Sequence, residues 1–140
     1  ESPVGGGPVS AVTEALRHVT TDWVAIAAGD SPGIAPGVQG LLDAAGLHAQ
    51  TGGAGARALS PNGHLQTMPC CVRSRELIRV LPDTVDGAAL WRVLDKLDLV
   101  PVVFAAEHLQ DVDTPADLDR VRQQLASDHG RSDRPDVPPR

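Results

Sequence analysis

Hydrophobic residues form an unbroken run from Trp23 to Ala28, and the run ends abruptly on a Gly-Asp-Ser-Pro turn. A short continuous apolar run is typical of a strand buried on both faces, as in a parallel sheet covered by helices. The pattern therefore predicts a strand over residues 23–28. Asp30 would follow the carboxyl end of that strand, where open α/β sheets place their ligands.

The rest of the pattern predicts helices that alternate with further strands. Apolar positions recur at helical spacing after Pro8, and Asn62-Gly63 is a strong hairpin signal between two strand-like runs. The expected helices cover residues 8–18, 36–46, 75–81 and 87–97, and the expected strands cover 23–28, 56–59, 65–72 and 99–104. This order predicts an α/β domain, and Pro101 favours an edge or strand-start position for the last strand.

The last expected helix opens with a clear N-terminal signal. Thr114 suits the N-cap, Pro115 the first helical position and Asp117 the third, which makes a capping box with Asp in place of Glu. Leu118 and Val121 begin the inward stripe of this helix, which continues to Leu125.

The two ends of the chain and one internal segment carry weaker patterns. Residues 127–140 are polar and lack periodicity, so we expect a disordered tail after a domain of residues 1–126. The glycine-rich residues 51–55 are expected to be mobile. The opening Glu1 belongs to a loop-like stretch, and we expect the beginning of the fold to lie upstream of it.

Composition narrows the function classes. Aromatic residues make up 2% of the chain and the formal net charge is −6 with scattered basic residues, so a nucleic-acid partner is not expected. The acidic balance does not exclude a nucleotide ligand, because a divalent cation can bridge carboxylates to phosphates. No apolar run is long enough to span a membrane and no signal peptide is visible, so we expect no membrane partner and a cytoplasmic location. The neighbouring Cys70 and Cys71 are predicted to be small buried strand residues.

Two acidic segments are the candidates for chemistry. Asp30 follows a predicted strand, and Asp111 and Asp113 alternate around Val112, so both can face one side of an extended segment. Each segment alone is more typical of turns and helix caps. Together, they could form a split site for Mg²⁺, which binds one or two carboxylates plus substrate phosphates.

Three motifs in order carry a resemblance to a known family. Gly-Gly-Pro-Val-Ser-Ala at residues 6–11, Gly-Asp-Ser-Pro at 29–32 and Asp-Val-Asp-Thr-Pro-Ala-Asp-Leu at 111–118 resemble the nucleotidyltransferase family, and within it the molybdenum cofactor guanylyltransferases. The resemblance runs over nearly all of residues 5–125 and includes Gly63 to Met68, where the family has a hairpin on the pterin side. It implies a three-layer, Rossmann-like nucleotidyltransferase fold, here without its first strands and its signature phosphate-binding loop.

The resemblance also implies ligands and roles. GTP and molybdopterin would be the substrates, and Mg²⁺ the cofactor. Asp30 would be the catalytic Mg²⁺ ligand that contacts the α-phosphate, Asp113 would complete the metal site with Asp111 beside it, and Gly7 and Pro8 would border the nucleotide.

Other interpretations stay open. Because the glycine-rich basic loop is missing and the lone lysine, Lys96, cannot replace it, we expect these residues alone to be inactive or nearly so. The acceptor could instead be another phosphorylated small molecule, served by a guanylyl- or cytidylyltransferase. A third interpretation is a non-catalytic remnant that binds a partner through the hairpin at 56–72. A monomer or weak oligomer is expected.

Overall fold

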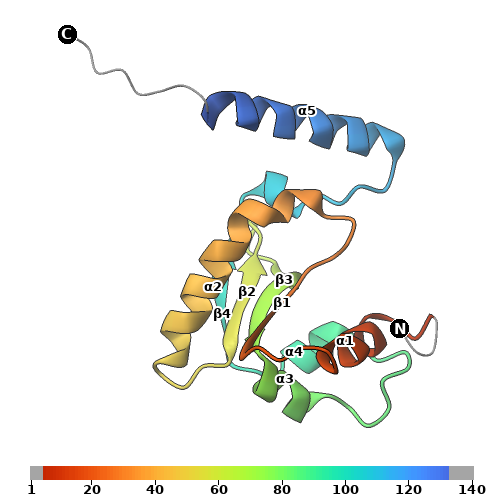
Figure 1. Cartoon of the computed structure of the whole chain (residues 1–140), viewed down its shortest axis with the longest axis vertical. Helices are drawn as coiled ribbons and strands as arrows, with labels where there is room; N and C mark the ends of the chain where they lie inside the picture. The colour runs from red at the N-terminus through yellow and green to blue at the C-terminus, as the bar shows by residue number, and fades with distance from the viewer. Residues whose placement is uncertain (1–4, 133–140) are drawn as a thin grey trace.

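The computed structural model describes residues 5–132, and side chains as far as residue 123 (Figure 1). Its centre is one four-stranded sheet with the order β1-β3-β2-β4. The strands are β1 (Trp23–Ile26), β2 (Gly55–Leu59), β3 (Leu65–Arg73) and β4 (Leu99–Val103). Strand β3 runs antiparallel to both of its neighbours, whereas β2 and β4 are parallel. Strands β1, β2 and β4 therefore point the same way, and we call the edge where they end the carboxyl end of the sheet.

Helices cover both faces of the sheet, so the chain has the α/β architecture that its pattern predicts (Figure 1). The helices are α1 (Pro8–Leu16), α2 (Ala35–Ala49), α3 (Ser74–Val80), α4 (Leu90–Leu94) and α5 (Pro115–Ser132), with short 3-10 turns η1 (Pro32–Ile34) and η2 (Ala106–Leu109). One buried cluster joins β1 and β3 to α1, α3 and α4: Val9, Leu16, Ile26, Cys70, Val72, Leu77, Leu90, Val93 and Leu94. The other joins the opposite face to α2: Leu41, Ala45, Ala56, Ala58, Cys71 and Phe104.

The two cysteines show how the faces divide. Successive strand residues point to opposite sides of a sheet, and Cys70 and Cys71 accordingly belong to the two different clusters, both fully buried and both free thiols. The prediction that they are small core residues of a strand is confirmed.

Local signals in the sequence also hold. Strands β2 and β3 form the expected hairpin around Pro61 to Gly63, and β4, which contains Pro101, lies at an edge of the sheet. At the start of α5 the Thr114 N–H donates to Asp117 Oδ2 at 3.0 Å, and the Asp117 N–H donates to Thr114 Oγ1 at 3.2 Å. These reciprocal bonds are the predicted capping box.

The predicted burial of the first strand is wrong. Strand β1 is an edge strand in the described sheet and pairs antiparallel with β3, and Ala25 is exposed. A short apolar run cannot by itself distinguish a central strand from an edge strand.

The glycine-rich segment 51–55, whose composition predicts a mobile loop, leads into β2 and is partly buried. Gly53 to Gly55 are buried, and Gly55 begins β2. The Ala54 N–H donates to the Asp98 carbonyl at 2.8 Å, while the Ala54 carbonyl accepts from the Arg73 N–H at 2.9 Å. Ladder-like hydrogen bonds therefore fix this segment against its neighbours.

The helix boundaries differ most from the pattern in three places. Helix α2 continues through Gly46 to Ala49, since a helical glycine costs only about 1 kcal/mol and Ala45 is fully buried beside it. Helix α4 is restricted to Leu90–Leu94, within the predicted 87–97. Helix α5 extends to Ser132, past the predicted start of the tail at 127, and residues 133–140 lie outside the described part of the chain.

Among residues 5–132, the structure contains no helix that is both long enough and apolar enough to cross a bilayer.

Candidate functional site

The two acidic segments meet at the carboxyl end of the sheet. The Ser31 hydroxyl, just after β1, donates to Asp111 Oδ1 at 2.5 Å, although the two residues are 80 positions apart. The Val112 N–H donates to the Asp30 carbonyl at 2.8 Å. One side-chain bond and one backbone bond thus join the loop after β1 to the loop that precedes α5. Contact between these two loops is one condition for a split carboxylate site.

Two glycines allow the segments around this junction to approach closely. A methyl group at Gly33, in η1, would lie 2.8 Å from the Glu107 carbonyl oxygen in η2. A methyl group at Gly37, in α2, would lie 2.2 Å from the Phe104 ring, which directly follows β4. Neither glycine is predicted as a site residue from the sequence. The only available signal was their position just after the Gly-Asp-Ser-Pro turn.

The three aspartates are not equivalent. Asp111 is held by Ser31, whereas the carboxylates of Asp30 and Asp113 are exposed and have no hydrogen-bond or ion-pair partner among residues 5–123. The same described residues contain no group of three or more His, Cys, Asp or Glu side chains that could hold a metal ion. Mg²⁺ does not require such a cage, because it usually keeps several waters and takes one or two carboxylates plus substrate phosphates. The chemistry of two exposed carboxylates on adjoining loops fits that mode of binding.

Gly7 and Pro8 occupy a different neighbourhood. Gly7 is the N-cap of α1 with φ 85°, a left-handed conformation that favours glycine, and Pro8 takes the first helical position. The preceding Gly6 carbonyl accepts from the Gly87 N–H at 3.2 Å, so this loop is tied to the segment before α4. In Figure 1 the start of α1 lies near α4, whereas the acidic loops lead into α5 at the other end of the molecule. The described hydrogen bonds thus bring Asp30 and Asp111 together and link the Gly-Pro loop to α4.

The two thiols have no place in this site. Burial raises the pKa of Cys70 to about 12, with the neighbouring Cys71 adding to the effect, and burial also raises the pKa of Cys71. A thiolate is the form that binds metals and attacks electrophiles, so both side chains act as uncharged core residues at neutral pH.

The carboxylate of Asp117, at the start of α5, is the acidic group whose titration the structure perturbs. The hydrogen bond from the Thr114 hydroxyl, aided by the Thr114 N–H and by Arg120, lowers the pKa of Asp117. This carboxylate therefore stabilises the N-terminus of α5. Asp113 directly precedes Thr114, the N-cap of that helix.

A scan against protein-family models finds no matching family, and searches of curated proteins and of solved structures find no match either.

Proposed function

We propose that this chain is part of a nucleotidyltransferase of the molybdenum cofactor guanylyltransferase type, which transfers GMP from GTP to molybdopterin. The observation that carries the proposal is the pair of hydrogen bonds joining the Asp30 loop to the Asp111 loop across 80 positions. The α/β architecture, with both loops at the carboxyl end of the sheet, supports the finer expectation of a Rossmann-like nucleotidyltransferase fold.

The reaction would be attack of the molybdopterin terminal phosphate on the α-phosphorus of GTP, with pyrophosphate as the leaving group. Such a transfer depends on positioning and on neutralising charge more than on covalent help from the protein. Asp30 and Asp113 would hold Mg²⁺, which when bound supplies positive charge beside the phosphates. Ser31 would be a positioning residue, because its bond to Asp111 fixes the spacing of the two loops.

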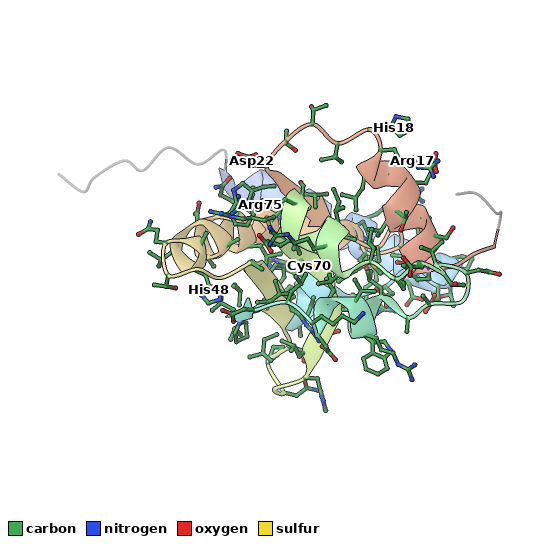
Figure 2. The ribbon with its side chains drawn as sticks, turned by 90° about the horizontal axis from the view of Figure 1, so that it is seen from below. Arg17, His18, Asp22, His48, Cys70 and Arg75 are labelled. Atoms are coloured by element: carbon green, nitrogen blue, oxygen red, sulfur yellow. The ribbon has the colours of Figure 1, made fainter. Side chains whose placement is uncertain are left out.

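Calorimetric titration of the chain with GTP, in the presence of Mg²⁺ or of EDTA, tests the metal-dependent half of this proposal. We expect a component of GTP binding that needs Mg²⁺ and that weakens by about tenfold in Asp30→Asn and in Asp113→Asn, equivalent to about 1.4 kcal/mol for each lost ligand. Asp22→Asn is the matched control, because Asp22 is also exposed and directly precedes β1, at the opposite end of the strand that Asp30 follows (Figure 2). GTP binding that persists unchanged in EDTA, or that survives Asp30→Asn, would favour the non-catalytic interpretation.

The acceptor is tested by binding, because these residues alone are expected to be inactive or nearly so. Molybdopterin, a phospho-sugar and phospholactate are titrated by calorimetry into the chain in the presence of GTP or of CTP, at the same Mg²⁺ concentration. Binding of molybdopterin in the presence of GTP supports the proposed substrate pair. Binding of another acceptor instead would indicate a different branch of the nucleotidyltransferases, and binding of no acceptor would contradict the proposed pair.

A further inference from the structure

A polar hollow of about 450 Å³ lies at the end of the sheet opposite the acidic loops. Its walls come from the segment before β2, from Arg73 at the end of β3, from α3 and from Lys96 to Asp98 before β4. Because β3 runs antiparallel to β2 and β4, the end of β3 lies at the same end of the sheet as the starts of β2 and β4. Figure 2 looks at the molecule from this side and labels Arg75 and His48 there.

Charge in this hollow is opposite in sign to that of the whole chain. The chain carries a formal net charge of −6, with 12 Lys and Arg residues in total. Four of these cations line the hollow, against two carboxylates: Arg73, Arg75, Arg79, Lys96, Glu76 and Asp98. A concave site lined by an excess of one sign concentrates ligands of the other sign.

Ion pairs within the hollow do not neutralise all of its positive charge. Glu76 forms ion pairs with both Arg75, at 3.1 Å, and Arg79, at 3.2 Å. The carboxylate of Asp98 lies 3.2 Å from His48 Nε2, so its nearest partner is outside the cation cluster.

The remaining two cations have no carboxylate partner within the described residues. The Arg73 guanidinium lies 5.2 Å from the centre of the Trp23 ring, a cation–π contact that leaves its N–H donors available. Lys96 Nζ donates to the Val80 carbonyl at 3.4 Å, which leaves two of its three donors for other acceptors. Arg73 and Lys96 thus present charge and unused donors from two different segments.

We propose that this hollow binds a small anion bearing phosphate groups. Arginine and lysine together suit phosphate, because the guanidinium fork contacts two oxygens while the ammonium supplies a point charge. Cations from β3, α3 and the α4–β4 segment converge, so an anion with several charges gains more than one with a single charge. The volume is in the range of small-molecule sites. The proposal is independent of the proposed nucleotidyl transfer, since it uses no metal and none of the acidic residues at the carboxyl end.

The chain offers a specific reporter for this site. It contains two tryptophans and no tyrosine. When a Trp91→Phe protein is excited at 295 nm, the fluorescence therefore comes from Trp23 alone. Trp91 is 47% exposed, and its replacement by another aromatic ring should leave the fold intact. An anion that engages Arg73 will alter the contact of the guanidinium with the Trp23 ring and change that emission.

Pyrophosphate is titrated into the Trp91→Phe protein in EDTA, with calorimetry of the same mixture as a second measurement. We expect a saturable change in emission, with affinity about tenfold weaker in Lys96→Gln and in Arg79→Gln, each of which removes one charge-assisted contact. Arg17→Gln is the control, because Arg17 is an equally exposed cation at the end of α1 and is paired with Glu14 at 3.0 Å. Thermal unfolding of each variant verifies that it is folded.

Three results overturn the proposal. One is the absence of both a saturable emission change and a heat of binding. Another is an equal response to sodium chloride at the same ionic strength, which identifies general screening. The third is a loss of affinity in Arg17→Gln as large as that in Lys96→Gln. EDTA keeps the Asp30 region from contributing, so a negative result here leaves the Mg²⁺-dependent GTP test unaffected.

Discussion

At the carboxyl end of the sheet, Asp30 and Asp113 stand exposed on loops, whereas at the opposite end Arg73 and Lys96 line a hollow framed by strands and by α3. The acidic end is assembled from segments far apart in sequence and joined by one serine hydroxyl and one backbone N–H. The cationic end is built on residues at or next to the ends of secondary-structure elements. A chain of net negative charge thus separates acidic and basic side chains along the strand direction, and we expect the two ends to respond to different substitutions.

The largest change in the free energy of unfolding is expected from a substitution at Gly37, where α2 approaches Phe104 closely. Gly37→Ala places a methyl group 2.2 Å from the buried Phe104 ring, and overpacking of this kind destabilises by about 1–3 kcal/mol. Urea unfolding measures the loss.

Gly40→Ala is the matched control in the same helix, since a methyl group there meets nothing within 4 Å. Replacing an unconstrained helical glycine should stabilise the protein by about 0.5–1 kcal/mol. Equal effects of the two substitutions would show that α2 does not pack on Phe104 as described.

A smaller and more selective effect is expected from two serines at the two ends. Ser31→Ala removes the bond to Asp111 at the acidic end, and Ser74→Ala removes a 2.8 Å bond to the Thr21 carbonyl at the other end. Each loss should cost about 1 kcal/mol of folding free energy. Of the two variants, only Ser31→Ala should weaken Mg²⁺-dependent GTP binding, because Ser31 contacts the acidic loops and Ser74 does not.

Binding of GTP with Mg²⁺ and of pyrophosphate in EDTA is measured on both serine variants. Pyrophosphate binding in EDTA should survive Ser31→Ala. If Ser74→Ala reduced GTP binding as much as Ser31→Ala did, the two ends would not be independent.

The smallest effect is acid sensitivity confined to the start of α5. Because the pKa of Asp117 is lower in the folded protein than in the unfolded chain, its ionised form stabilises the fold above the ordinary carboxyl pKa. That contribution is lost as pH falls through the lower folded-state value. Below about pH 4 we expect the Thr114 amide resonance to shift and α5 to fray at its N-terminus.

Two variants define the source of this acid response. Asp117→Asn should abolish the pH-dependent shift, whereas Asp119→Asn should retain it, because Asp119 is exposed and its partner is Arg122, at 3.6 Å. A response that survives Asp117→Asn would assign the titration to another carboxylate.

Features set by local chemistry were predictable from the sequence. The capping box at Thr114, the hairpin at Asn62-Gly63 and the edge position of Pro101 each follow from bonds that neighbouring residues make or cannot make. The junction of the acidic loops was also within reach, because strands of one direction end at one edge of a sheet.

Features set by tertiary packing were not predictable. Gly46 looks like a helix end, but α2 continues past it because Ala45 is buried against the sheet. Arg57 lies in an Ala-Arg-Ala-Leu stretch that gives no sign of burial, yet it is 6% exposed and bonds to Asp95 at 2.7 Å. The cationic hollow was not predictable for the same reason. Its residues are scattered in the chain and converge only because β3 runs antiparallel to β2 and β4.

The adjacent thiols on β3 can report when each helix layer detaches from the sheet. Cys70 faces the layer of α1, α3 and α4, and Cys71 faces α2, so each is shielded by a different set of helices. Alkylation requires an exposed thiolate, so each cysteine will be modified only when its own layer lifts from the sheet. Mass spectrometry after timed exposure to an alkylating reagent would therefore read the order in which the two layers detach, residue against neighbouring residue, in a chain that has no other cysteine.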